Sequence, residues 1–178
     1  MTRATTLAMG KAARLTLMGF DVDGVLTDGT LYFSSLGDEI KAFSSLDGHG
    51  LKMLRRAGVE VAIISGRSSR ALELRAANLG IEALHMGVED KRAVLNELAA
   101  QRGIELAQTG YMGDDVVDLP ILRACGFSVA VPDAHAEVLA RVDYVASRGG
   151  GRGAVREVCD LILRAQGKWD AAMAGYLS

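Results

Sequence analysis

Residues 15–28, LTLMGFDVDGVLTD, decide the fold. The mostly apolar run 15–20 predicts a buried strand, and it ends abruptly at Asp21 and Asp23, which are followed by Gly24. A short apolar run bounded by turn residues is typical of a central strand in a parallel sheet. Two carboxylates just past such a strand lie where open α/β sheets bind their ligands. A polar strand-to-loop turn is the alternative, because Asp and Gly favour turns.

Length and composition indicate an ordinary globular protein. The 178 residues are 49% hydrophobic and 24% charged, and they suit one α/β domain covering 1–178. The net charge of −2 gives no reason to expect nucleic acid or an anionic membrane as a partner. No apolar run approaches the length of a membrane span, and residues 1–14 lack the apolar stretch of a secretory signal. We therefore expect a cytoplasmic protein.

The rest of the chain alternates between strand and helix patterns. After a predicted antiparallel hairpin at 30–43, the periodicity and glycine stops predict strands and helices in regular succession. Strands are expected at 59–64, 81–87, 109–115, 127–134 and 143–147, and helices at 47–58, 68–80, 88–103, 116–126, 135–142 and 149–167. The tail at 167–178 has no clear period. This alternation predicts a doubly wound, mostly parallel, Rossmann-like sheet with right-handed crossovers.

Three strands end in residues able to take part in catalysis, and parallel strands place these ends at one edge of the sheet. The three pairs are Asp21 and Asp23, Ser65 and Gly66, and Asp114 and Asp115. Lys91 opens the helix after the third strand, so its ammonium can reach the same edge. Carboxylates and a carbonyl bind Mg²⁺, while a hydroxyl, backbone N–H groups and an ammonium bind phosphate. A free carboxylate can attack phosphorus. Taken singly, each pair also fits a polar turn, and Lys91 a surface lysine.

Four motifs together carry a family resemblance. DVDGVLTD, IISGR, Lys91 and GDDVVD follow one another in the order of the four motifs of the haloacid dehalogenase superfamily of phosphatases. The strings FSSLDGHGLK, MGDDVVDLP and GGRGAVREVCDLIL are similar to one branch, the 3-deoxy-D-manno-octulosonate 8-phosphate (KDO 8-phosphate) phosphatases. The resemblance implies Mg²⁺-dependent hydrolysis of KDO 8-phosphate to KDO and phosphate through an aspartyl-phosphate, in lipopolysaccharide precursor synthesis.

The resemblance also implies roles for the residues at the strand ends. Asp21 resembles the nucleophile, and Asp23 the acid that protonates the leaving oxygen and then activates water. Asp21, the Asp23 main-chain carbonyl and Asp114 resemble the Mg²⁺ ligands. Ser65 and Lys91 resemble the residues that bind the transferring phosphoryl group.

Further residues are assigned supporting and substrate-binding roles by the same resemblance. Gly66, Asp115 and Asp118 are expected to support the site, although either aspartate could instead cap the next helix. Arg67 directly follows the phosphate-binding turn, and Arg75 lies about two helical turns further on. Either could equally be a surface arginine. The expected substrate contacts are Asp23, Ser44, Ser45, Leu46, Asp47, Gly48, Lys52, Arg67, Arg75 and Lys91.

The spacing of the motifs leaves no room for a cap domain. Only 40 residues separate Gly24 from Ser65, and 24 separate Gly66 from Lys91. Because phosphoryl transfer benefits from a screened site, something else is expected to cover it. The resemblance implies a homotetramer in which the hairpins meet and the C-terminal tail of a neighbour approaches the site. A loosely ordered terminus is the alternative for this tail.

Three other functions remain open from the sequence. A phosphatase of another phosphosugar acid, of the nonulosonate 9-phosphate type, would keep the chemistry and change the substrate. A non-enzymatic phospho-accepting receiver domain also uses strand-end aspartates and a lysine, but it needs neither Asp23 as proton donor nor the hairpin. An inactive oligomerisation module would not need the set of catalytic residues.

Overall fold

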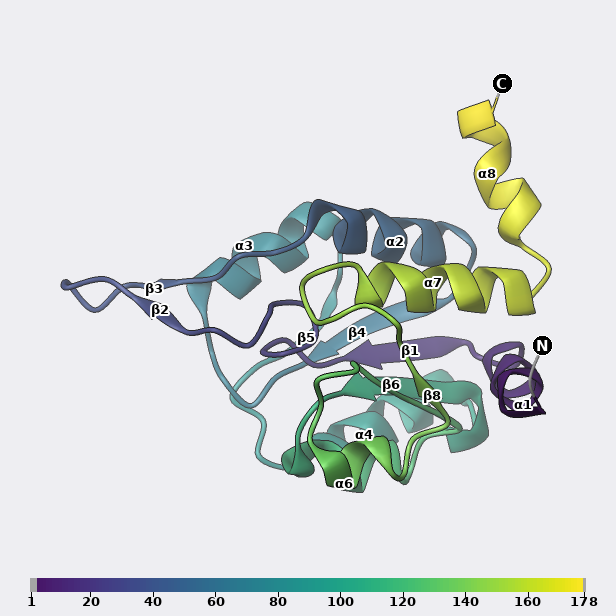
Figure 1. Cartoon of the computed structure of the whole chain (residues 1–178), viewed down its shortest axis with the longest axis horizontal. Coiled ribbons are helices and arrows are strands. Elements are labelled where there is room, and N and C mark those ends of the chain that lie inside the picture. Colours follow the sequence, from purple (N-terminus) through teal and green to yellow (C-terminus); the bar gives the residue numbers. More distant parts are fainter. Residues whose placement is uncertain (1–2, 178) are drawn as a thin grey trace.

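The structure, a computed structural model, describes residues 3–177. Its centre is a six-stranded sheet in which every neighbouring pair of strands is parallel (Figure 1). In sheet order the strands are β5 (Ala83–His85), β4 (Glu60–Ile64), β1 (Leu17–Phe20), β6 (Thr109–Gly113), β7 (Phe127–Ala130) and β8 (Tyr144–Val145). The first strand predicted from the sequence is therefore central, and all four of its residues are buried.

Helices cover both faces of this sheet (Figure 1). On one face lie α2 (Ser45–Arg56), α3 (Arg70–Leu79) and α7 (Ala154–Ala165), and on the other α4 (Lys91–Arg102), α5 (Leu119–Leu122) and α6 (Ala136–Leu139). The buried apolar faces of these helices and the strands form one continuous core. The predicted doubly wound α/β fold is confirmed. The predicted helices and strands are all present, although most are a few residues shorter than expected.

The order of the strands reverses next to β1. From β1 the chain passes to β4 and β5 on one side of it, and then crosses to β6, β7 and β8 on the other. Asp21 follows β1 and Asp114 follows β6, so both lie at the switch point where open α/β sheets bind ligands. Gly24 has a φ of +88°, and a Cβ there would lie 2.0 Å from the Oδ2 of Asp114. Only glycine allows the two loops to approach this closely.

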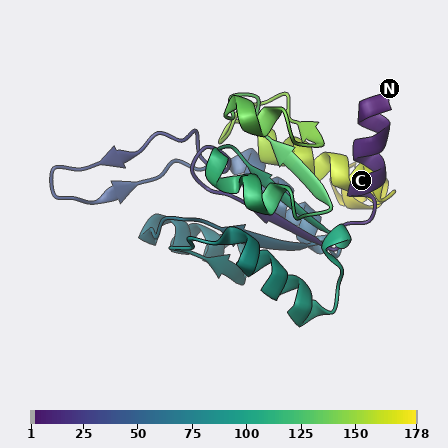
Figure 2. The ribbon, with the colours of Figure 1, turned by 90° about the horizontal axis from the view of Figure 1, so that it is seen from below.

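The predicted hairpin is confirmed. Strands β2 (Tyr32–Phe33) and β3 (Glu39–Ile40) pair antiparallel, and the hairpin extends well beyond the body of the molecule (Figures 1 and 2). Apart from it, only α2 lies between β1 and β4, and only α3 and β5 lie between β4 and α4. The expectation that the chain has no cap domain therefore holds.

Two terminal helices were not predicted. Helix α1 (Arg3–Ala12) packs on α7 through buried Ala8 and Ala12. The tail without clear periodicity forms α8 (Trp169–Leu177), none of whose residues is buried. Both views place α8 at the opposite end of the molecule from the hairpin (Figures 1 and 2). No helix in the described part of the chain is long and apolar enough to cross a membrane.

Candidate active site

Three carboxylates converge at the switch point. One oxygen from each of Asp21, Asp114 and Asp118 lies within 4.8 Å of the others. Asp118 ends the short 3₁₀ helix η2 (Val116–Asp118), and it approaches the strand end because Gly113 has no side chain. A Cβ on Gly113 would lie 2.5 Å from the Oδ2 of Asp118. Three carboxylates this close suit a hard divalent cation such as Mg²⁺, which prefers oxygen ligands.

Lys91 is the cation that the chain itself supplies to this cluster. It is the first residue of α4 and is 6% exposed, with its Nζ 2.9 Å from the Oδ1 of Asp21 and 2.7 Å from that of Asp118. Burial by itself would lower the pKa of Lys91, but the two carboxylates outweigh it and raise that pKa above its ordinary value. The lysine therefore stays charged and fixes the orientation of Asp21.

One ammonium does not neutralise three carboxylates. Burial, and then the charge of Asp118, raise the pKa of Asp21 to about 6, although Lys91 opposes the shift. Burial, and then the charges of Asp21 and Asp118, raise the pKa of Asp114 to about 7. Burial and the neighbouring negative charges thus both disfavour the ionised carboxylates, and a bound cation would offset both effects. The residues present therefore fit a bound divalent metal.

A cavity of about 580 Å³ opens onto this cluster. Most of the residues predicted to act in catalysis line it: Asp21, Asp23, Ser65, Gly66, Arg67, Lys91, Asp114 and Asp115. Sequence reasoning missed four further lining residues, Gly29, Val88, Glu89 and Val117. The Oγ of buried Ser65 accepts a hydrogen bond from the backbone N–H of Arg67 at 3.2 Å. The turn after β4 therefore presents both a hydroxyl and a guanidinium to the cavity.

Asp115 and Asp118, which the sequence predicted either to support the site or to cap a helix, lie in different surroundings. Asp115 is exposed, and its carboxylate caps η2 by accepting the N–H of Val116 at 2.7 Å. Asp118 is fully buried and accepts the backbone N–H of Asp114 at 3.0 Å as well as the ammonium of Lys91. Asp118 therefore lies inside the acidic cluster, beside the predicted metal ligands Asp21 and Asp114, and its supporting role stays a prediction.

The segment from Ser44 to Gly48 does not line this cavity, because it packs helices together. Ser44 caps α2, with its Oγ accepting the N–H of Asp47 at 3.3 Å. The buried carboxylate of Asp47 accepts the N–H groups of Gly153 at 3.2 Å and Arg156 at 2.8 Å, and so anchors the start of α7. Asp47 thus holds two elements together across 106 residues of chain.

The remaining predicted substrate contacts also lie outside the cavity. Arg75 donates to the carbonyl oxygen of Ser44 at 2.9 Å, and a Cβ on Gly48 would lie 2.1 Å from its Nη2. Ser45 and Leu46 are exposed in the first turn of α2, and Lys52 is half-buried further along it. Within one chain, only Asp23, Arg67 and Lys91 of the predicted substrate contacts therefore line the cavity. The roles of the others stay predictions.

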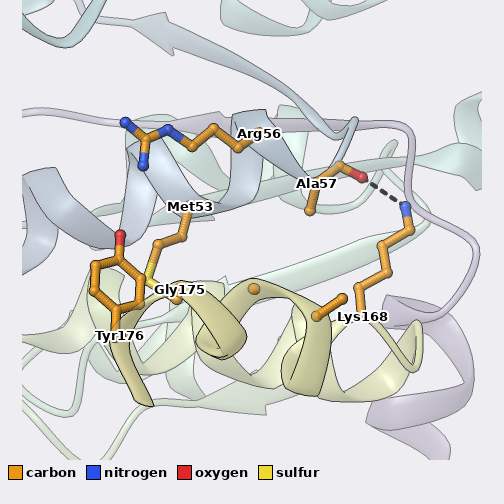
Figure 3. Close-up of a pocket in the computed structure, with 8 residues that line it drawn as sticks. Met53, Arg56, Ala57, Lys168, Gly175 and Tyr176 are labelled. Carbon is orange, nitrogen blue, oxygen red and sulfur yellow. Dashed lines mark hydrogen bonds between the residues drawn. The ribbon is translucent and has the colours of Figure 1, made fainter. Parts of the chain in front are cut away.

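A second cavity, of about 620 Å³, lies between α2 and α8 (Figure 3). Its lining residues are Met53, Arg56, Ala57, Lys168, Ala171, Ala172, Gly175 and Tyr176. None of these is acidic, and none was predicted to act in catalysis. Lys168 donates to the carbonyl oxygen of Ala57 at 2.8 Å, which ties the two helices together (Figure 3). The chemistry therefore belongs to the cavity at the carboxyl edge of the sheet.

Comparison with known proteins agrees with this geometry. Residues 81–153 match the haloacid dehalogenase-like hydrolases. Over 168 residues the chain is 46% identical to the 3-deoxy-D-manno-octulosonate 8-phosphate phosphatase of Salmonella typhi, and the match covers 94% of this chain and 89% of that one. The chain belongs to this phosphatase family of haloacid dehalogenase-like hydrolases. It is a phosphoric monoester hydrolase, as the four motifs predicted.

Solved structures from the family superimpose closely on this phosphatase. The 3-deoxy-D-manno-octulosonate 8-phosphate phosphatase of Moraxella catarrhalis, in complex with a magnesium ion, a phosphate ion and KDO, has a TM-score of 0.93 and 44% identity. That match covers 95% of this chain and 97% of the other. The cobalt-bound enzyme of Haemophilus influenzae has a TM-score of 0.89 and 45% identity, over 94% and 99% of the two chains. Both relatives bind a divalent metal, which is the kind of ligand that the acidic cluster fits.

Proposed function

We propose that this phosphatase hydrolyses KDO 8-phosphate to KDO and inorganic phosphate, with Mg²⁺ as its cofactor. The observation that carries the proposal is the cluster of Asp21, Asp114 and Asp118 with Lys91, three of which line one cavity while Asp118 lies buried behind them. The Moraxella catarrhalis relative, which holds magnesium, phosphate and KDO, supports the choice of metal and substrate. The product would serve lipopolysaccharide precursor synthesis, and a cytoplasmic location stays a prediction.

The reaction would proceed through an aspartyl-phosphate on Asp21. A carboxylate oxygen of Asp21 attacks phosphorus, while Lys91 and Ser65 hold the phosphoryl oxygens. As the bond from phosphorus to the sugar oxygen breaks, Asp23 gives that oxygen a proton. Asp23 then takes a proton from water, which attacks phosphorus, releases phosphate and restores Asp21.

The metal would be held by Asp21, the main-chain carbonyl of Asp23 and Asp114. When bound, Mg²⁺ offsets the repulsion between these carboxylates and the phosphate dianion. Asp118 lies in the same cluster, where it orients Lys91 and accepts the backbone N–H of Asp114. It is therefore placed to support the metal ligands from behind.

We also propose that the enzyme is a homotetramer held by the hairpin 30–43. Tyr32, Phe33 and Ile40 are 47%, 60% and 59% exposed, which leaves an apolar surface on a hairpin too small for a core of its own. Helix α8 lies at the far end of its own chain from the hairpin (Figure 1). If the tail 167–178 helps to close an active site, that site belongs to a neighbour.

Phosphate release from a panel of esters tests the proposed function. The panel holds KDO 8-phosphate, a nonulosonate 9-phosphate and an aryl phosphate, each with excess chelator and with Mg²⁺ restored. We expect Mg²⁺-dependent turnover with the highest kcat/KM on KDO 8-phosphate. Preference for the nonulosonate ester would change the substrate and keep the chemistry. Full activity in chelator would refute the metal assignment, and the absence of turnover would favour a phospho-accepting receiver.

A further inference from the structure

Four charged side chains form a closed ring where the hairpin meets the sheet. The Nζ of Lys41 pairs with the Oδ1 of Asp23 and lies 3.2 Å from the Oε1 of Glu39. The Nη2 of Arg67 lies 3.0 Å from the same Glu39 oxygen, and its Nε lies 3.6 Å from the Oδ2 of Asp23. Two carboxylates and two cations thus alternate around the ring, and the sequence predicted a role for only two of the four residues.

The hairpin supplies half of this ring. Glu39 lies in β3 and Lys41 follows it two residues later, so in an extended chain both side chains point to the same side. Ile40, between them, is 59% exposed. Asp23 and Arg67 come from the loops after β1 and β4. The hairpin therefore touches the predicted acid of the reaction through one lysine side chain.

The two cations of the ring differ in exposure. The side chain of Lys41 is 2% exposed and that of Arg67 is 45% exposed. Arg67 lines the cavity, whereas Lys41 is not among the lining residues. Arg67 can therefore turn towards a ligand, while Lys41 stays with its carboxylates. Loss of Lys41 would leave Asp23 without its closest cation and Glu39 with Arg67 alone. Because both carboxylate side chains are largely buried, this is a costly change.

The contacts to Asp23 distinguish its two oxygens. Lys41 donates a hydrogen bond to Oδ1. The 3.6 Å between Arg67 and Oδ2 is too long for a hydrogen bond, and among residues 3–177 no hydrogen bond to Oδ2 is found. With Oδ1 held, the carboxyl group cannot rotate freely, and Oδ2 keeps only the longer ion pair with Arg67.

We propose that Lys41 is a positioning residue for Asp23, and that Oδ2 of Asp23 is the oxygen that transfers the proton. The inference rests on the proposed function, in which Asp23 is the acid for the leaving group. The proton on Oδ2 passes to the bridging sugar oxygen as the bond from that oxygen to phosphorus breaks, and Lys41 keeps its own protons throughout. The hairpin thereby acts on the chemistry as well as on assembly.

If Lys41 positions Asp23, the loss of kcat/KM in a Lys41 variant should depend on the leaving group. If Lys41 only holds the hairpin in place, the loss should not. A sugar alkoxide needs a proton as it leaves, whereas an aryl oxide with a low pKa leaves without one. Lys41→Met is compared with wild type by kcat/KM, which covers the steps up to phosphorylation of Asp21, on KDO 8-phosphate and on an activated aryl phosphate. A lysine that only ties the hairpin down would lower both values equally.

We expect Lys41→Met to lose about 10- to 100-fold on the sugar phosphate, in line with the cost of small misplacements of catalytic groups, and no more than about 3-fold on the aryl ester. Lys41→Arg should recover part of the loss, because it retains a cation. The matched control is Lys11→Met, which breaks another lysine–aspartate pair, at 2.5 Å to Asp143, on α1. It should leave both values unchanged.

Equal losses on both esters, or no loss on either, would overturn the inference. If Lys41→Met fails to fold, Lys41→Gln is put through the same comparison, because it keeps a polar head group of similar length. Asp23→Asn is measured alongside to separate this inference from the proposed function. If Asp23→Asn is itself insensitive to the leaving group, the acid assignment fails. If Asp23→Asn is sensitive and Lys41→Met is not, only the role of Lys41 fails.

Discussion

The carboxyl edge of the sheet and the two appendages of the chain are built in different ways. At the edge, Asp118 and Lys91 are 0% and 6% exposed, and each is fixed by several hydrogen bonds and ion pairs. The hairpin has strands of two residues each, and α8 has no buried residue at all. The edge is therefore held by a dense set of buried polar contacts, whereas the appendages leave much of their apolar surface exposed.

This difference suggests that the edge carries out the phosphoryl transfer, while the appendages govern assembly and the choice of substrate. Changes at the edge should damage the reaction with every ester, because all esters share the phosphoryl group. Changes in the appendages should damage assembly, or the reaction with the sugar phosphate alone. Substitutions at the edge and in the appendages test that division.

Asp21→Asn should lower turnover by on the order of 10⁴- to 10⁶-fold with sugar and aryl esters alike, because an amide cannot attack phosphorus. The measurement is phosphate release, with circular dichroism to show that the fold is retained. Asp133→Asn is the matched control, since Asp133 is exposed and does not line this cavity. Near-normal release by folded Asp21→Asn would exclude Asp21 as the nucleophile.

Asp118→Asn should cost about 10- to 100-fold, the usual range for residues that orient metal ligands. The amide keeps the size of the side chain but removes a charge that Lys91 and the bound cation both need. The loss should again be the same for sugar and aryl esters, and the Mg²⁺ concentration for half-maximal activity should rise. A variant with unchanged metal dependence would leave Asp118 as a helix cap only.

Phe33→Asp should weaken assembly, because Phe33 is 60% exposed on the hairpin proposed to hold the tetramer. Analytical ultracentrifugation at micromolar concentration is the measurement. Ser35→Asp, at the polar turn of the same hairpin, is the control and should sediment like wild type. A wild-type monomer with full activity would end the tetramer proposal.

Deletion of residues 168–178 should leave the fold intact, because it removes one hydrogen bond to Ala57 and helix α8, whose residues are at most partly buried. Turnover of the sugar phosphate should fall several-fold while that of the aryl ester stays within about 2-fold, since a lid mainly affects binding and release of a large ligand. Identical kinetics on both esters would remove the lid proposal and leave the tetramer standing.

The metal-free protein should lose stability as the pH rises from 5 towards 7.5. The folded-state pKa values of Asp21, about 6, and Asp114, about 7, lie above the ordinary value of 3.8, so the folded state binds protons more tightly than the unfolded state in this window. The melting temperature should therefore fall by a few degrees over this range. Saturating Mg²⁺ should oppose the fall, and Asp114→Asn should reduce it.

Much of the fold and of the central site could be predicted because the signals are local. A buried strand that ends in Asp21 and Asp23, and a lysine that opens a helix, are visible within a few residues. The edge of a parallel sheet then brings such ends together whatever lies between them.

What the sequence did not reveal depends on contacts between distant segments. Asp47 reads as part of a substrate-binding segment, yet it anchors α7 across 106 residues. The sequence assigned Lys41 no role beyond its place in the hairpin, and its burial against Asp23 depends on how the hairpin packs on the sheet edge. Helix α8 has no apolar period to detect, because none of its residues is buried in the chain.

The proposed mechanism requires that Asp21 carries the phosphoryl group. Wild-type enzyme is mixed with Mg²⁺ and KDO 8-phosphate, quenched in acid within milliseconds, digested and analysed by mass spectrometry. We predict that the peptide containing residues 15–28 gains the mass of one phosphoryl group on Asp21, and that Asp21→Asn shows no such gain. A phosphoryl group on another residue, or full turnover with no phosphorylated peptide at any quench time, would contradict the account.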